Sequence, residues 1–223
     1  LLTLSSLVFA HDGSVLAGVY YGAENGGGAV YRSTDGGNTW QPVGSGLDAA
    51  SVLALASVPT GSMAFYVGAE GGLWRLDVAQ GGPAEPGTWQ GNGPRGGRAL
   101  ALAVSPDFVN DGTAFTGEWI DHKGGGQSGL GILRSDDQGQ TWQPSSSGTE
   151  NVAYATAVHD YAFSPDFAAD RIAFAATWGG LCRSTDGGQT WAWVGRLYSG
   201  DPQHPVTRAL APHLRSFSIS RAR

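Results

Sequence analysis

Three octets decide the fold of this chain: STDGGNTW (33–40), SDDQGQTW (135–142) and STDGGQTW (184–191). All three fit the pattern Ser-x-Asp-x-Gly-x-Thr-Trp, and a shortened copy, GTW (87–89), lies between the first two. The tryptophans that end these segments are separated by 49, 53 and 49 residues: Trp40, Trp89, Trp142 and Trp191. Such a fixed period indicates a repeat architecture, in which each repeat is one supersecondary unit.

A second element recurs ahead of the octets. The segment SPDFVNDGTAF (105–115) matches SPDFAADRIAF (164–174), and an apolar run such as RALALAV (98–104) precedes it. One period then predicts four short strands, namely the apolar run, AFTG (114–117), GILR (131–134) and a strand that starts at the octet tryptophan. Four antiparallel strands in roughly 40–50 residues are typical of a β-propeller blade, so we expect an all-β propeller.

The octets resemble Asp-boxes, which are also called bacterial neuraminidase repeats. Over residues 1 to about 200, the repeat as a whole resembles the propellers of sialidases, sortilin-type sorting receptors, xyloglucan-cleaving glycoside hydrolases and photosystem assembly factors. These families have different activities, so the resemblance implies a fold and leaves the function open. Most of them work outside the cytosol, which by analogy implies an extracytoplasmic or secreted protein.

We expect the octets to be structural turns rather than catalytic sites. The aspartate accepts backbone hydrogen bonds within the turn, the glycine adopts a positive φ, and the tryptophan buries its ring between blades. One catalytic site does not need three copies, and each turn offers too few oxygens for calcium. The predicted structural residues are Ser33, Asp35, Gly37, Thr39, Trp40, Ser135, Asp137, Gly139, Thr141, Trp142, Ser184, Asp186, Gly188, Thr190 and Trp191.

The period predicts about four blades plus one extra strand. RALA (98–101) recurs at 208–211, so residues 201–223 are interpreted as the start of a fifth blade or as a basic C-terminal tail. The four blades are expected at residues 1–44, 45–92, 93–146 and 147–198.

Three arrangements account for this number of blades. The chain is part of a larger propeller of six or seven blades, which we favour, or it closes as four blades, or it completes a ring with other chains. An open arc would expose apolar faces and strand edges between blades, so self-association through the open blade edges is a further expectation.

Composition excludes several other classes of protein. Glycine accounts for 36 of 223 residues and charged residues for 14%, while eight tryptophans argue against a disordered chain. No apolar stretch is long enough to predict a membrane span. The net charge of −6 argues against nucleic-acid binding, which needs a basic face. The single cysteine, Cys182, is expected to be a small buried hydrophobe.

Candidate binding residues lie where the sequence departs from its own repeat. The longest loop between the second and third strands of a blade is expected at EWIDHKGGGQSG (118–129). Aromatic side chains there and in the equivalent loops, together with neighbouring polar groups, could line a mouth that binds a sugar or a peptide. The ligand-binding candidates are Trp119, His122, Trp178, Tyr20, Tyr21, Glu24, Glu70 and His159.

Two classes of function remain open from the sequence. The first is a non-catalytic scaffold that binds a protein or carbohydrate ligand or assists assembly, without a metal or a cofactor. The second is a glycoside hydrolase, sialidase-like or endoglucanase-like, because two carboxylates at a suitable separation can hydrolyse a glycosidic bond. The weak catalytic candidates are Glu118, Asp121 and Asp160, of which Asp160 and His159 are predicted to form a structural pair on an innermost strand. We favour the scaffold, because the repeats are regular and no complete catalytic constellation is evident.

Overall fold

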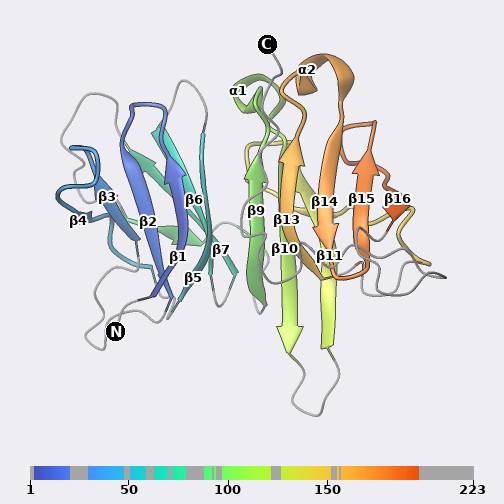
Figure 1. Cartoon of the computed structure of the whole chain (residues 1–223), viewed down its shortest axis with the longest axis horizontal. Coiled ribbons are helices and arrows are strands. Elements are labelled where there is room, and N and C mark those ends of the chain that lie inside the picture. The colour runs from blue at the N-terminus through green and yellow to red at the C-terminus, as the bar shows by residue number, and fades with distance from the viewer. Residues whose placement is uncertain are drawn as a thin grey trace.

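The described part of the chain forms four antiparallel sheets of four strands each (Figure 1). The computed structural model describes residues 3–20, 30–47, 51–58, 63–69, 72–78, 88–91, 93, 97–121, 127–151, 155 and 157–195. The expected all-β architecture of four-stranded propeller blades is therefore confirmed. The prediction for residues 201–223 lies outside the described residues.

Each sheet is one blade, and its strands follow one another in chain order. Blade 1 consists of β1 (Thr3–Phe9), β2 (Val15–Tyr20), β3 (Val30–Ser33) and β4 (Gln41–Pro42). Blade 2 consists of β5 (Val52–Ser57), β6 (Met63–Ala69), β7 (Gly72–Val78) and β8 (Gln90–Gly91).

The second half of the chain has the same order. Blade 3 consists of β9 (Arg98–Val104), β10 (Ala114–Asp121), β11 (Gln127–Ser135) and β12 (Gln143–Pro144). Blade 4 consists of β13 (Val158–Phe163), β14 (Ala173–Thr177), β15 (Gly180–Ser184) and β16 (Ala192–Gly195). In blades 1, 3 and 4 the last strand begins one residue after the octet tryptophan, not at it as the sequence suggested.

The hairpin in the middle of blade 3 is longer than the sequence predicted. Residues 118–129 were expected to form a loop, yet β10 continues to Asp121 and β11 already begins at Gln127. Glu118, Trp119 and Asp121 are therefore strand residues. The pairing of β10 shifts register against both neighbouring strands next to Glu118, so bulges in β9 and β11 accommodate this extension.

Short helices connect the first two strands of blades 3 and 4. α1 (Phe108–Asp111) and α2 (Phe167–Asp170) are formed by the two SPDF segments. Ser105 donates its hydroxyl to Asp111 at 2.8 Å, and Ser164 donates to Asp170 at 2.6 Å, while the phenylalanines of both segments are buried. The repeated sequence therefore encodes a hydrogen-bonded turn. No helix among the described residues is long and apolar enough to cross a membrane.

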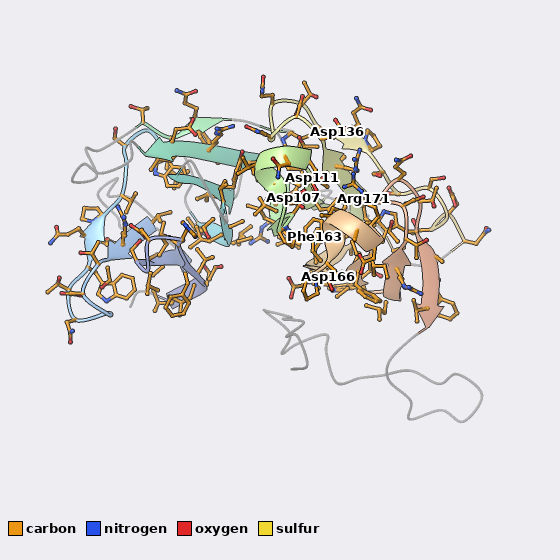
Figure 2. The ribbon with its side chains drawn as sticks, turned by 90° about the horizontal axis from the view of Figure 1, so that it is seen from above. Asp107, Asp111, Asp136, Phe163, Asp166 and Arg171 are labelled. Carbon is orange, nitrogen blue, oxygen red and sulfur yellow. The ribbon has the colours of Figure 1, made fainter. Side chains whose placement is uncertain are left out.

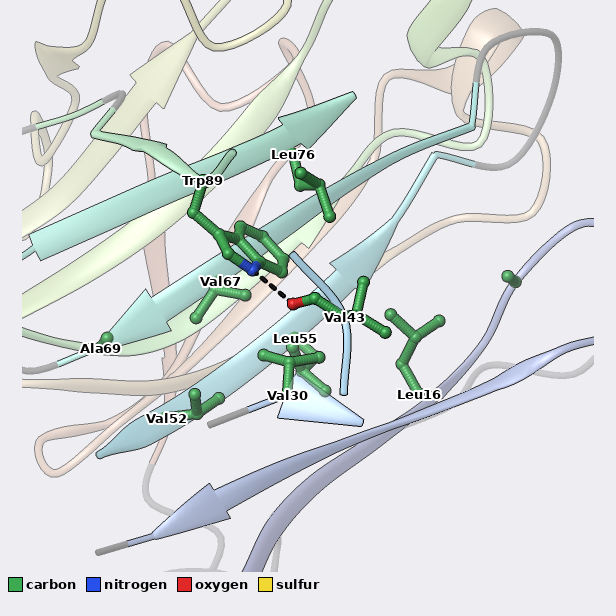
Figure 3. Close-up of a cluster of buried hydrophobic side chains, with 10 residues drawn as sticks. Leu16, Val30, Val43, Val52, Leu55, Val67, Ala69, Leu76 and Trp89 are labelled. Atoms are coloured by element: carbon green, nitrogen blue, oxygen red, sulfur yellow. Dashed lines mark hydrogen bonds between the residues drawn. The ribbon is translucent and has the colours of Figure 1, made fainter. Parts of the chain in front are cut away.

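The hydrophobic core lies between blades rather than within one of them. One cluster joins blades 1 and 2 around Leu16, Val67 and Trp89 (Figure 3). The indole of Trp89 donates to the carbonyl oxygen of Val43 at 2.8 Å, so the tryptophan of the shortened repeat is buried and tied to the preceding blade. Two further clusters join blade 2 to blade 3 and blade 3 to blade 4.

The blades follow an open arc. In the view from above, blades 1 and 4 lie at the two ends of the arc and do not meet (Figure 2). Leu7 and Phe9 of β1 remain 62% and 76% exposed at one end. Because a propeller blade normally packs against a neighbour on each side, each end of the arc presents a blade face of the kind that is buried elsewhere in the chain.

Candidate functional site

The carboxylates of the octet aspartates accept hydrogen bonds from residues of their own turns. Asp35 accepts hydrogen bonds from the amide of Thr39 at 2.9 Å, the hydroxyl of Thr39 at 2.6 Å and the hydroxyl of Ser33 at 2.8 Å. The octets of blades 3 and 4 repeat these contacts through Asp137 and Asp186. The glycines at the fifth octet position have φ angles of 95°, 78° and 85°. The geometry is that of a structural turn.

The acidity of these carboxylates agrees with that role. Hydrogen bonds from the hydroxyl and then the amide of Thr39 lower the pKa of Asp35 to about 2. In Asp137 and Asp186 burial raises the pKa, but hydrogen bonds from the neighbouring threonine and serine outweigh it and the net shift is downward. Carboxylates held in the ionised form by their own turn are poor proton donors at neutral pH.

The octet tryptophans differ from one another, which the sequence did not predict. Trp191 is buried, whereas Trp40 is 37% exposed. The indoles of Trp40 and Trp142 donate to the carbonyl oxygens of Gly37 and Gly139 at 3.0 and 3.2 Å. The indole nitrogen of Trp191 has no acceptor among the described residues. The expectation that each ring is buried between blades is therefore wrong for Trp40.

Four candidate residues share one position at the end of the second strand. Tyr20, Trp119 and Trp178 each lie five residues beyond the residue that pairs with the octet serine, and Glu70 is their counterpart in blade 2. The structure places Tyr20 and Trp119 on β2 and β10, and Asp121 farther along β10. Tyr21, Glu24, Glu70 and His122 lie outside the described residues.

Trp178 forms the best-defined element of the candidate site. Its ring stacks on the imidazole of His159, with centroids 5.5 Å apart and an interplanar angle of 15°. Trp178 as a whole remains 48% exposed. Its amide donates to the carbonyl oxygen of Ala157 at 3.1 Å, and the next residue, Gly179, donates to the hydroxyl of Thr177 at 3.1 Å. The exposed ring thus stacks on His159, and hydrogen bonds hold the backbone at Trp178 and Gly179.

His159 and Asp160, which the sequence predicted as a structural pair, are adjacent residues of β13. Both are half-buried on β13. Burial lowers the pKa of His159, whose Nε2 has no hydrogen-bond partner among the described residues. The carboxylate of Asp160 accepts from the amide of Tyr161 at 2.9 Å. His159 therefore supports the ring of Trp178.

Glu118 is the other unusual group. It lies on β10 opposite Ala99 of β9 and Gly131 of β11, at a position that the other blades fill with Val19, Ala69 and Thr177. Its side chain is 1% exposed, and neither carboxyl oxygen has a partner in the described part of the chain. Burial alone raises the pKa of Glu118 to about 7. The carboxyl group of Glu118 therefore stays protonated and uncharged at pH values below about 7.

We searched the described candidate residues for a possible metal site. Among the described residues, no group of three or more histidine, cysteine, aspartate or glutamate side chains is arranged to hold a metal ion. Cys182 is buried, and burial raises the pKa of its thiol to about 11, so it behaves as a small apolar residue of the core between blades 3 and 4. What the described part of the site offers is an exposed aromatic ring and, separately, one buried carboxyl group.

Sequence comparison identifies the repeat directly. Residues 133–144 match the BNR/Asp-box repeat family. No curated protein matches the sequence of the chain.

Solved structures show the fold of the whole array. An ancestral GH74 enzyme aligns with a TM-score of 0.64 and 20% identity, over 91% of this chain and 25% of that protein. The extracellular domain of the one-component system described as BT4673, from B. thetaiotaomicron, aligns with a TM-score of 0.57 and 12% identity, over 91% and 24%. YCF48 from Cyanidioschyzon merolae aligns with a TM-score of 0.53 and 15% identity, over 81% and 50%.

These identities establish a shared fold only. The chain spans between 24% and 50% of the length of these three proteins. The octets, the four-stranded sheets and the structural matches agree with one another, and the chain is an array of Asp-box β-propeller blades.

Proposed function

We propose that this chain is a non-catalytic propeller scaffold that binds a protein or carbohydrate ligand at the end of the blades where Trp178 lies. The observation that carries the proposal is the stack of Trp178 on His159, which leaves almost half of Trp178 exposed. An aromatic ring held in place offers a large contact area at a low cost in conformational entropy. Sugar rings and apolar peptide side chains are the ligands that such a surface suits.

The hydrogen-bonded backbone around Trp178 supports this proposal. Both backbone neighbours of Trp178 are held by hydrogen bonds, and the indole of Trp193 adds one to the carbonyl oxygen of Gly179 at 3.2 Å. An exposed tryptophan without such support would lose more side-chain freedom on binding. The strand position of Trp178 is shared by Tyr20 and Trp119, so aromatic residues recur at this end of three blades.

Glycoside hydrolysis is the second candidate, because Glu118 has the acidity of a general acid. Its pKa of about 7 would allow it to protonate a leaving group near neutral pH. Two features weigh against this function. The carboxyl is inaccessible to a substrate oxygen in the observed arrangement, and burial alone, with no second carboxylate, accounts for its pKa. Hydrolysis by the usual mechanisms needs two carboxyl groups flanking the scissile bond.

The test compares binding and hydrolysis of the same probes. Native gels cast with soluble xyloglucan, mixed-linkage β-glucan or mannan measure binding as retardation, and release of reducing ends measures hydrolysis. We expect retardation by at least one polysaccharide, its loss in Trp178→Ala, and its retention in Val194→Ala, which removes an exposed apolar side chain of the same blade. No reducing ends should appear.

Three outcomes would change the conclusion. Retardation that survives Trp178→Ala would place the ligand elsewhere. Reducing ends whose release falls at least a hundredfold in Glu118→Gln would make the protein a hydrolase. No retardation on any gel would exclude these carbohydrates, and the same two variants would then be compared on a peptide array.

A further inference from the structure

The contact between blades 3 and 4 is built around one aromatic side chain. Phe115 of β10 stacks on Phe163 at 5.0 Å with an interplanar angle of 9°, lies 5.4 Å from Tyr161, and meets the octet tryptophan Trp191 edge-on at 5.4 Å. The octet glycine Gly188 leaves room for it, since a Cβ on that residue would collide with the Phe115 ring. Phe115 thus inserts against the octet of the next blade.

An arginine accompanies this aromatic residue. Arg134 is the cross-strand partner of Phe115, and its Nε donates to the carbonyl oxygen of Gly187, the fourth octet residue of blade 4, at 3.0 Å. Blade 2 holds blade 3 in the same way. Tyr66 and its cross-strand partner Arg75 both donate to the fourth octet carbonyl, that of Gln138, at 2.7 and 3.0 Å. We call each such cross-strand pair of an aromatic residue and an arginine a clasp.

Between neighbouring blades of the described chain, the clasp occurs only where the following blade has an octet. Blade 2 carries the shortened repeat, and the blade before it has Leu16 at the aromatic position. Its arginine, Arg32, bonds to Asp12 and Ser14 of its own blade instead of reaching across. Within the described residues, a blade therefore has the aromatic residue of the clasp when the blade after it carries an Asp-box turn, and lacks it when that turn is shortened.

The two ends of the arc are complementary by this rule. Blade 4 has a complete clasp, because Phe174 and Arg183 are cross-strand partners, and here Phe174 is only half-buried and Arg183 is exposed. Blade 1 has a complete octet that no clasp in the described part of the chain covers. Its residues from Thr34 to Trp40 are exposed, and a Cβ on Gly37 would meet only the ring of Trp40 at 3.9 Å.

We propose that the clasp of blade 4 binds the octet of blade 1 in a second copy of this chain. Two such head-to-tail contacts would join two copies of the described arc through both of its ends. Phe174 takes the place of Phe115, and Arg183 donates to the carbonyl oxygen of Gly36 as Arg134 does to that of Gly187. This interface is independent of the ligand surface at Trp178.

The rest of the blade 1 face matches the partners of Phe115. Phe9 and Leu7 occupy the register positions of Phe163 and Tyr161, counted from the residue that pairs with the octet serine. Trp40 corresponds to Trp191 at the end of the octet. An apolar ring entering this face would therefore be surrounded as Phe115 is, and the exposed apolar area of both ends would be buried together.

The experiment measures the mass of the 223-residue chain in solution against concentration. Sedimentation equilibrium is expected to give twice the 23.0 kDa of one chain at micromolar concentration. Phe174→Asp and Phe9→Asp should each leave a monomer, and Arg183→Ala should weaken the dimer about tenfold per interface, the effect of losing one charge-assisted hydrogen bond. Val109→Asp, which changes an exposed apolar residue on α1, should leave the dimer intact.

Mixing the variants tests the head-to-tail geometry. Phe174→Asp retains a normal blade 1 and Phe9→Asp retains a normal blade 4, so an equimolar mixture should form a dimer through one intact interface. A wild-type chain that stays monomeric, a dimer that survives Phe174→Asp, or a mixture that stays monomeric would each overturn the proposal. Circular dichroism of each variant confirms that the blades remain folded.

Discussion

The octets of blades 1 and 4 differ in sequence only at Asn38 and Gln189, yet they end in different surroundings. Both make the same turn, with serine and threonine hydroxyls bonded to the central aspartate. The tryptophan of the first is 37% exposed and that of the second is 2% exposed. The comparison separates two effects. Local hydrogen bonds form the turn in either place, and the preceding blade decides whether the turn contributes to the core.

The tryptophans should show the largest difference in stability. We expect Trp191→Ala to lower the free energy of unfolding by about 3–5 kcal/mol, because it empties a packed site beside Phe115. Trp40→Ala should cost about 1 kcal/mol, since its ring is already partly in water. Urea unfolding checks both, at a protein concentration where the chain is monomeric. Equal losses would mean that the turn itself, and not the neighbouring blade, determines how much the tryptophan contributes to the free energy of unfolding.

Glu118 gives a second comparison between blades, because the other blades have small or apolar side chains at its strand position. Its folded pKa of about 7 lies above the unfolded value of about 4.3, so the folded state binds the proton more tightly. The stability that this gives is complete below pH 4 and is lost as the pH rises through 7, by roughly 4 kcal/mol at most. Well above pH 7 this contribution stays constant.

Thermal unfolding between pH 4.5 and 8 measures this effect. Glu118→Gln should flatten the decline and raise the midpoint at pH 8, because the amide does not ionise. Glu150→Gln is the control, since the pKa of the exposed Glu150 is lowered by the backbone amides of Glu150 and Gly148 and shifts in the opposite direction. Parallel profiles for wild type and Glu118→Gln would show that Glu118 ionises with a partner.

The smallest expected difference in stability is between alanine substitutions at the fifth octet position of blades 1 and 4. Gly37 and Gly188 both have a positive φ, so alanine strains the backbone by about 1–2 kcal/mol at either position. Only at Gly188 does the added methyl also collide with Phe115, which adds about 1–3 kcal/mol. We therefore expect Gly188→Ala to unfold at a lower urea concentration than Gly37→Ala. If the two variants unfold together, the ring of Phe115 moves aside at no measurable cost.

Much of the fold was predictable because it is encoded locally and repeated. The segment 98–104 forms a strand over the predicted range, and the octet contacts of Asp35 follow from the spacing of serine, aspartate and threonine. The hairpin of blade 3 was mistaken for a loop because its glycines suggested a break, whereas β10 and β11 remain paired as far as Asp121 and Gln127, beyond bulges opposite Glu118. Register between strands, not composition, decided where that hairpin ends.

Less of the site was predictable, because it depends on contacts between strands that are distant in sequence. Trp178 and His159 were both candidates, but their stacking arises only when β13 and β14 pair. The clasps were not predicted from the sequence, although their arginines recur at one position in each blade. Aligning the second strand on the octet serine, which places Tyr66, Phe115 and Phe174 at one position opposite those arginines, would have revealed them.

By itself, the sequence determined the number of turns, their internal hydrogen bonds and the all-β class of the chain, because each of these depends on residues within one repeat. Only the tertiary structure decided which copies are buried. Trp191 meets Phe115 of the preceding blade, whereas Trp40 meets no such residue in the described chain. Burial is a property of neighbours, and the neighbours of a blade come from another repeat.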